Sequence, residues 1–372
     1  MSLRLHVATR KGLMSWRHDS GKWSTQPVHF LGDTVTQLFP DERDRSLYAV
    51  LTLGHFGAKL RRLPEGASEW IECGVPVYPE GAEVNDGPPR EDGSIKKKPA
   101  SLKEIWALES AGSDRPGELW AGTIPGGLFR STDRGLTWSI VESLWNREER
   151  SGWFGGGKDD PGIHSVCVDP TNSKRVAIGI SCGGAWFSND GGETWSVGQG
   201  MRAEYMPPNL AYEPNTQDPH RMVLCPAKPD RMWIQHHNGV FKSDDFAANW
   251  TEVTDVRPAP FGFAVVVHPK NPDTAWLVPA VKDEKRVPVD SRVVVSRTRD
   301  GGKSFDVLSQ GLPEPPAFDL VYRHALDVAG DGSTLAFGST TGGLWVSENG
   351  GDSWNCLTHT LPPIYAVRFS SF

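Results

Sequence analysis

Four octets that align without gaps decide the fold: STDRGLTW (131–138), SNDGGETW (188–195), TRDGGKSF (298–305) and SENGGDSW (347–354). A fifth copy, SDDFAANW (243–250), has lost the glycine, and two weaker units end at Trp23 and Trp70. In each octet the Asp or Asn and the Ser or Thr side chains can accept hydrogen bonds from nearby amides, while glycine supplies positive φ. The octets therefore predict tight hairpin turns whose closing aromatic residues pack between neighbouring strands.

The closing aromatic residues divide the whole chain into seven units, since they recur at positions 23, 70, 138, 195, 250, 305 and 354. A short glycine-bounded strand pattern, such as GGAWF (183–187), precedes each clear octet, and two further apolar patterns precede that strand. Four short strands per unit, repeated at roughly 50 residues, are typical of propeller blades. The sequence thus predicts an all-β, seven-bladed β-propeller with four antiparallel strands per blade, formed as a single domain by residues 1–372.

The two ends of the chain predict how the ring closes. The first pattern, LRLHVAT (3–9), corresponds to the second strand of a blade, so the N-terminal blade lacks its innermost strand. The last pattern, IYAVRF (364–369), has the alternation of an inner strand. We therefore expect the C-terminal strand to join the N-terminal blade.

Composition excludes several classes of protein. The 372 residues carry a formal net charge of −7, which argues against a nucleic-acid partner. No run of 18 apolar residues exists, so no membrane span is expected, and the first residues lack a signal-peptide pattern. Five cysteines, an odd number, fit reduced thiols in the cytoplasm. Because a closed ring leaves few free sheet edges, a monomer is expected.

The octets resemble the Asp-box (BNR) repeat, S/T-x-D-x-G-x-T-W/F, of the sialidase superfamily, and the copies span essentially the whole chain. The resemblance implies a sialidase-like, glycosyl hydrolase-like propeller with carbohydrate binding as one expected function. Asp-box propellers also include xyloglucan-cleaving glycosidases, sorting receptors and photosystem assembly factors. Since unrelated functions share this fold, the resemblance leaves open whether the chain is an enzyme.

Long insertions indicate the working face of the propeller. Segments 71–103, 141–162, 196–219 and 306–321 join blades on one face, and 280–291 interrupts the sixth blade there. Insertions of this length predict a pocket with a lid.

Alignment of the inner strands predicts one residue per blade at the mouth of the central channel: Tyr365, Thr34, Glu104, His164, His220, Phe263 and His324. His236 and His237 end a second strand on the same face, and three arginines lie close by in sequence: Arg10, Arg221 and Arg323. Trp153, in the glycine-rich segment 152–157, is placed to stack on a sugar, and Cys182 ends a strand that faces the pocket. The predicted ligand is a glycan or another small polar molecule.

The first functional hypothesis is a glycan-directed hydrolase. By resemblance to sialidases, Tyr365 and Glu104 would be the nucleophilic pair and Asp160 the acid, with the three arginines clamping a substrate carboxylate. The Arg-Ile-Pro motif of sialidases is absent, since segment 8–12 reads ATRKG, and true sialidases have six blades. Another carbohydrate-directed reaction is therefore expected rather than true exo-sialidase activity.

Two alternatives remain open from the sequence. Glu104, His164 and His220, on three consecutive blades, could hold an Fe, Mn or Zn ion in a metal-dependent enzyme, although no HxxxH or CxxC spacing supports this. The cofactor is thus unknown, with a divalent or transition metal as the candidate. Alternatively, the ring is a non-catalytic scaffold that docks a protein partner through loops around 96–98 and 147–150.

Overall fold

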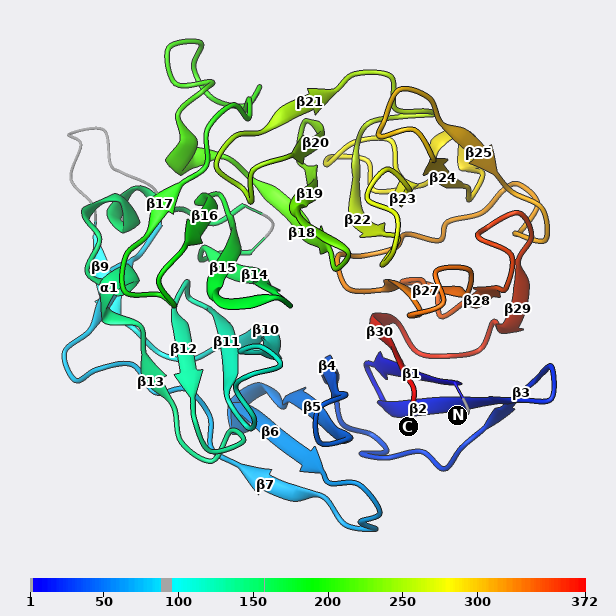
Figure 1. Ribbon diagram of the computed structural model, residues 1–372, viewed down its shortest axis with the longest axis horizontal. Helices are drawn as coiled ribbons and strands as arrows, with labels where there is room; N and C mark the ends of the chain where they lie inside the picture. Colours follow the sequence, from blue (N-terminus) through cyan, green and yellow to red (C-terminus); the bar gives the residue numbers. More distant parts are fainter. Residues whose placement is uncertain (1–2, 88–95, 157) are drawn as a thin grey trace.

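The computed structural model describes residues 3–87, 96–156 and 158–372. Seven four-stranded antiparallel sheets surround a central axis (Figure 1), which confirms the predicted seven-bladed propeller. Helical segments are short: α1 (Glu142–Trp145) and four 3-10 turns, Gly54–Phe56, Glu148–Gly152, Pro214–Thr216 and Val289–Ser291. None of the helices in the described part of the chain is long and apolar enough to cross a membrane.

Each blade begins with an innermost strand at the channel and continues outward to the rim. The first blade contains β30 (Ile364–Ser370), β1 (Leu3–Thr9), β2 (Gly12–Asp19) and β3 (Lys22–Thr25). The second contains β4 (Val35–Asp41), β5 (Ser46–Thr52), β6 (Ala58–Leu63) and β7 (Ile71–Cys73). The third contains β10 (Glu104–Ser110), β11 (Leu119–Ile124), β12 (Leu128–Ser131) and β13 (Ser139–Ile140). The fourth contains β14 (Gly162–Asp169), β15 (Asn172–Ser181), β16 (Gly184–Ser188) and β17 (Ser196–Val197).

The remaining three blades have the same order. The fifth contains β18 (Pro219–Cys225), β19 (Lys228–His236), β20 (Gly239–Ser243) and β21 (Thr251–Val253). The sixth contains β22 (Gly262–Val267), β23 (Ala275–Pro279), β24 (Val295–Thr298) and β25 (Asp306–Leu308). The seventh contains β26 (Leu326–Val328), β27 (Leu335–Gly338), β28 (Leu344–Ser347) and β29 (Asn355–Thr358). A separate hairpin, β8 (Glu83–Asn85) with β9 (Lys97–Pro99), lies in the insertion after the second blade.

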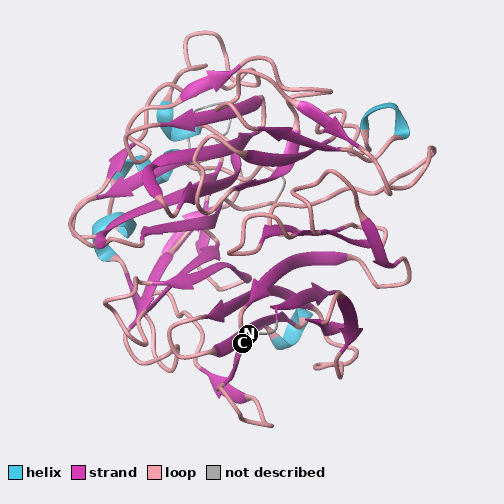
Figure 2. Cartoon of the chain, turned by 45° about the vertical axis from the view of Figure 1, so that its right-hand side comes forward, coloured by secondary structure: helices cyan, strands magenta, loops and turns pink. Residues whose placement is uncertain are grey.

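The ring closes as predicted from the chain ends. Strand β30 pairs antiparallel with β1, with Val7 opposite Val367, and is the innermost strand of the first blade. The two termini consequently lie side by side (Figure 2). Val7 and Val367 are both fully buried, so the closing strand contributes to the core as well as to the sheet.

The octets form the predicted stapled turns. In 188–195, Asp190 Oδ1 accepts hydrogen bonds from the Ser188 hydroxyl (2.7 Å) and the Thr194 amide (2.9 Å), and Oδ2 accepts one from the Thr194 hydroxyl. The Gly192 amide donates to Ser188 Oγ (2.8 Å), and Trp195 Nε1 donates to the Gly192 carbonyl (3.1 Å). Equivalent staples are centred on Asp133, Asp245, Asp300 and Asn349. The four Asp carboxylates and the Asn349 amide thus serve as hydrogen-bond acceptors in the turns.

Replacing Asp190 by Asn is expected to remove a pH-dependent contribution to stability. The hydrogen bonds from Thr194 lower the pKa of Asp190 to about 2 from an ordinary value of 3.8. A lowered pKa in the folded state stabilises the fold above pH ~4, and this contribution is lost as the pH falls toward 2. Because the side chain is exposed, we expect the difference in unfolding free energy at pH 6 to be about 1 kcal/mol or less. Urea unfolding of both proteins at pH 6 and pH 3 measures it, and an equal difference at both pH values would contradict the assignment.

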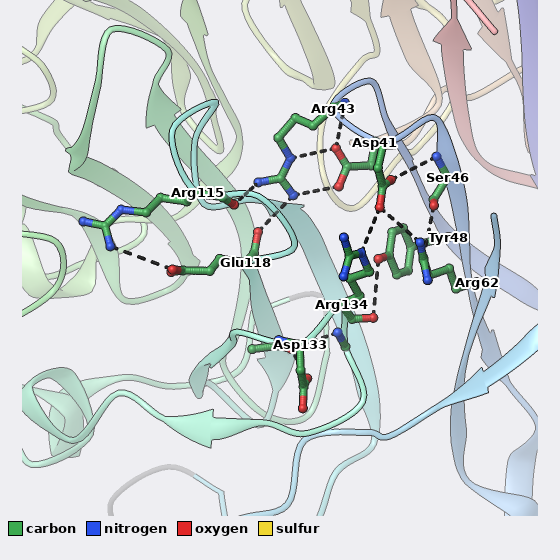
Figure 3. Close-up of polar contacts among 12 residues, drawn as sticks. Asp41, Arg43, Ser46, Tyr48, Arg62, Arg115, Glu118, Asp133 and Arg134 are labelled. Atoms are coloured by element: carbon green, nitrogen blue, oxygen red, sulfur yellow. Dashed lines mark hydrogen bonds and ion pairs between the residues drawn. The ribbon is translucent and has the colours of Figure 1, made fainter. Parts of the chain in front are cut away.

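Ion pairs also join neighbouring blades (Figure 3). Arg43 binds Asp41 through two hydrogen bonds of 2.7 Å and donates to the backbone carbonyls of Arg115 (2.7 Å) and Glu118 (3.0 Å) in the next blade. Asp41 is buried, so this bidentate pair fixes the Arg43 guanidinium, whose hydrogen bonds to the Arg115 and Glu118 carbonyls link blades two and three.

Candidate functional site

A cavity of about 500 Å³ lies at the channel mouth, where the inner strands begin. Six of the seven predicted mouth residues line it: Thr34, Glu104, His220, Phe263, His324 and Tyr365. A cavity of this volume accommodates a ligand of drug size, which is also the size of a short oligosaccharide.

Three of the long insertions contribute to the walls of this cavity. Segment 141–162 supplies Phe154, Gly156 and Lys158, segment 196–219 supplies Tyr205 and Asp218, and segment 280–291 supplies Asp283 and Arg286. Within the described residues, segments 71–103 and 306–321 contribute none of the lining. The expectation that the loops of this face surround the mouth thus holds for three of the five segments.

Asp218 is the buried carboxylate of the cavity wall. Its Oδ1 accepts hydrogen bonds from the Ser181 hydroxyl and the Cys182 amide, both at 3.1 Å. Its Oδ2 lies 3.4 Å from His220 Nε2 and 3.4 Å from His237 Nδ1. Burial alone would raise the pKa of Asp218, but its contacts with His220 and His237 and the nearby Arg323 charge lower it well below its ordinary value. The group is therefore an ionised carboxylate facing the cavity.

The two histidines beside Asp218 differ in environment. The His220 ring stacks on Phe263 at 4.7 Å, and its Nδ1 lies 2.7 Å from the Gly262 carbonyl. Burial lowers the pKa of His220. For the more exposed His237, the carboxylate of Asp218 outweighs burial and raises the pKa. Because a carbonyl can only accept a hydrogen bond, His220 Nδ1 is the donor to Gly262, and Nε2 is the nitrogen that faces Asp218.

Arg323 is an arginine of the cavity wall without an ion-pair partner among the residues that the structure describes. Its Nε is buried without a hydrogen-bond partner, and its guanidinium lies over the Trp106 ring (4.9 Å) and the Phe263 ring (5.5 Å). Burial lowers the pKa of Arg323, although arginine stays charged. A desolvated guanidinium of this kind is suited to bind an anionic oxygen of a ligand.

The other charged groups of the cavity are paired with each other. Lys158 contacts Glu104 at 3.0 Å, and Arg286 contacts Asp283 at 2.5 Å. Glu104 therefore occupies the mouth as predicted, but with a lysine partner that the sequence did not indicate.

The histidines predicted at the mouth lie at two levels. His220, His237 and His324 line the cavity, whereas His164 and His236 are fully buried. His164 Nε2 lies 2.6 Å from the Pro219 carbonyl, and His236 Nε2 accepts a hydrogen bond from the Asp218 amide (3.0 Å). Burial lowers the pKa of His236 to about 3.

The predicted metal trio is not assembled in the predicted form. His164 is hydrogen-bonded to backbone, Glu104 is paired with Lys158, and His220 faces Asp218 instead of either residue. Three metal-ligating side chains do meet in the wall: Asp218, His220 and His237 have ligand atoms within 4.8 Å of one another.

Four further predicted residues do not line the cavity. Arg221, on the inner strand β18, is half-buried, and desolvation together with the nearby Arg368 charge lowers its pKa to about 10; Arg10 is exposed. Asp160 is buried between Lys98 (2.8 Å) and Lys103. Trp153 packs against Trp186 and donates from Nε1 to Asn215 (2.7 Å), so it belongs to the core. Of the predicted three-arginine clamp, the structure places Arg323 alone at the cavity.

Several lining residues were not predicted from the sequence. Trp106 lies two residues after Glu104 on the same strand, so strand alternation could have found it. Asp218 directly precedes β18 and is identified only by its contacts with other segments. Tyr205 and Arg286 belong to long loops, whose sequences carry no signal for these positions.

Curated relatives resemble the chain over part of its length, although no protein-family model matches it. The chain is 26% identical over 268 residues to a probable oligoxyloglucan-reducing end-specific xyloglucanase of Neosartorya fischeri, covering 64% of this chain and 30% of that protein. It is 27% identical over 265 residues to the oligoxyloglucan-reducing end-specific xyloglucanase of Emericella nidulans, with the same coverages. The chain thus spans about a third of the length of the curated relatives it matches.

Solved structures share the fold. The GH74 xyloglucanase from Xanthomonas campestris matches with a TM-score of 0.59 and 17% identity, covering 95% of this chain and 52% of that chain. The periplasmic gluconolactonase of Pseudomonas aeruginosa matches with a TM-score of 0.60 and 10% identity, covering 100% and 99%. The chain is a seven-bladed propeller with GH74 xyloglucanases among its relatives.

Proposed function

We propose that this propeller binds a glycan, or a small polar ligand of similar chemistry, in the mouth cavity and hydrolyses it there. The observation that carries the proposal is the buried, ionised Asp218 in the wall of a cavity that also holds aromatic rings and the unpaired Arg323. The curated relatives named as xyloglucanases support a glycan as the ligand class.

Each part of the cavity has a physical role in this proposal. Trp106, Phe263 and Tyr322 offer apolar ring surface to a sugar, and Arg323 offers a charge for an acidic group. An ionised Asp218 can accept a proton from an attacking water, as the general base does in glycoside hydrolysis. Tyr365, one of the pair singled out from the sequence, lines the same cavity and is the candidate for donating the proton, whereas Glu104 is paired there with Lys158.

Acidic oligosaccharides are expected to bind more tightly than neutral ones. Calorimetric titration with oligogalacturonides and with xyloglucan oligosaccharides measures the two affinities. Because Arg323 lines the cavity and forms no ion pair among the described residues, we expect an advantage of about tenfold for the acidic set, and its loss in Arg323→Gln. Arg292→Gln, on an exposed arginine outside the cavity lining, is the control and should keep the preference.

Two outcomes would overturn this proposal. One is the absence of both binding and reducing-sugar release for either set of oligosaccharides at millimolar concentration. The other is an Arg323→Gln variant that binds both sets as the wild type does. The scaffold alternative predicts the first of these outcomes, so the same titration separates the two functions.

A further inference from the structure

Asp218, His220 and His237 bring one carboxylate oxygen and two imidazole nitrogens to a single point of the cavity wall. His220 Nε2 and His237 Nδ1 each lie 3.4 Å from Asp218 Oδ2, and all three atoms lie within 4.8 Å of one another. The residues come from β18, from the segment before it, and from the turn after β19, so two neighbouring strands of one blade hold the cluster.

The surrounding residues orient two of these side chains toward the common point. The Ser181 hydroxyl and the Cys182 amide bind Asp218 Oδ1, which leaves Oδ2 directed at the imidazoles. His220 Nδ1 donates to the Gly262 carbonyl (2.7 Å), so Nε2 is the ring nitrogen directed at Asp218. A carbonyl on the far nitrogen of a histidine and hydrogen bonds on the far oxygen of a carboxylate are the outer-shell contacts usual for metal ligands.

Aromatic rings hold the His220 side chain in this orientation. Phe263 stacks on its ring at 4.7 Å, and Phe261 packs edge-on at 5.8 Å. Asp218 Oδ2 and His220 Nε2 lie 3.4 Å apart, a separation at which one cation can contact both atoms.

The spacing fits a metal ion. Tetrahedral bonds of about 2.0–2.1 Å place neighbouring ligand atoms about 3.3–3.4 Å apart. Both distances from Asp218 Oδ2 meet this value, and the partly exposed His237 has room to adjust the third. Two imidazoles and a carboxylate are a ligand set of catalytic zinc sites, which keep a fourth position open for water or substrate.

We propose that Asp218 Oδ2, His220 Nε2 and His237 Nδ1 bind one divalent transition metal ion, for which Zn²⁺ is the best fit, with an open position facing the cavity. One carboxylate leaves the metal centre with a positive charge, and Arg323 adds another in the same cavity. Water or an anionic oxygen of a ligand therefore suits the open position. The site differs from the Glu104, His164 and His220 set expected from the sequence. It shares Asp218 with the proposed glycan site, so a bound metal ion would activate water in place of the free carboxylate, and zinc binding is tested without any glycan.

Zinc binding to the intact chain tests the site. Tag-free protein treated with EDTA and dialysed is titrated with ZnCl₂ by calorimetry, and its metal content is then measured by elemental analysis. We expect one equivalent of Zn²⁺, and binding weakened by about 100-fold or more in His237→Gln and in Asp218→Asn. Both substitutions are close in shape to the native residues, and circular dichroism checks that each variant is folded. His55→Gln, on an exposed turn away from the cavity, is the matched control and should bind as the wild type does.

A second readout identifies the ligands. Addition of Co²⁺ should produce the visible absorption of a four- or five-coordinate nitrogen and oxygen site, and Cys182→Ser should leave this spectrum unchanged. Less than a tenth of an equivalent of bound zinc, or a folded His237→Gln variant that binds zinc with wild-type affinity, would overturn the proposal. A spectrum with thiolate charge transfer that disappears in Cys182→Ser would also overturn the proposed ligand set.

Discussion

Replacing Asp218 by Asn is expected to lower kcat/KM by about 10³-fold for any glycan that the protein hydrolyses, the middle of the usual range for an acid–base group. The Asn oxygen can still accept hydrogen bonds from Ser181 and Cys182, so the local structure should be retained. The substitution removes the negative charge that accepts a proton, and it also weakens the proposed metal ligand. Initial rates of reducing-sugar release, with the melting temperature as a measure of folding, test this expectation.

The other carboxylates of the cavity provide the comparison. Asp283 lies beside Arg286 in a loop of the cavity wall. We expect the substitution Asp283→Asn to lower kcat/KM by less than about tenfold. Glu104→Gln tests the pair suggested by resemblance to sialidases. If Glu104→Gln abolished activity while Asp218→Asn retained more than a tenth of it, the assignment of Asp218 would be wrong.

Deletion of residues 362–372 is expected to abolish the cooperative folding of the ring. These residues contain β30, the inner strand of the first blade, and Ile364, Ala366 and Val367 are at most 1% exposed. Each large apolar side chain contributes about 1.5–3 kcal/mol by burial, and the exposed edges of β1 and the neighbouring blades add to the cost. Because whole domains are stable by only about 5–15 kcal/mol, we expect no cooperative thermal transition in the truncated chain.

A shorter deletion and an added peptide control this experiment. Removal of residues 371–372 leaves β30 intact and should lower the melting temperature by only a few degrees. A synthetic peptide of residues 362–372 should restore a cooperative transition to the long truncation, because it can pair with β1. A long truncation that melts like the intact chain would show that ring closure by β30 does not determine stability.

The fold could be predicted because its signals are local. Every hydrogen bond of the Asp190 staple joins residues within the octet 188–195, so the residues of the octet alone are enough to predict the turn. Ring closure was also predictable. The N-terminal blade lacked an inner strand, and segment 364–369 was the inner-strand pattern left over after the other blades were counted. The hairpin of β8 and β9 was not predicted, because it belongs to an insertion that the repeat does not specify.

The site could be predicted in part. Alignment of the inner strands predicted one residue per blade at the channel mouth, and His220, Phe263 and Tyr365 line the cavity there. His164 was expected at the same level but lies buried beneath Trp106, with ring centroids 5.4 Å apart. The importance of Asp218 arises from its contacts with Ser181 of the fourth blade and with His220 and His237 of the fifth blade. Such convergence depends on the packing of blades, which a linear pattern does not describe.

Arg323 illustrates the same limit for electrostatics. The sequence placed three arginines near the mouth, yet Arg221 lies on β18 outside the cavity lining and Arg10 is exposed. None of the three forms an ion pair among the described residues, so Arg323 is distinguished by its place in the cavity wall, with its guanidinium over Trp106 and Phe263 of two other blades. This position depends on how the blades pack and is visible only in the structure.

The most direct test of the mouth cavity as the functional site is a crystal structure of the Asp218→Asn protein soaked with an oligosaccharide that binds the wild type. We expect a sugar ring in the cavity, against Trp106 and within hydrogen-bond distance of Arg323. A sugar bound on the octet face, or between outer strands with the cavity left to solvent, would contradict the assignment of the cavity as the functional site.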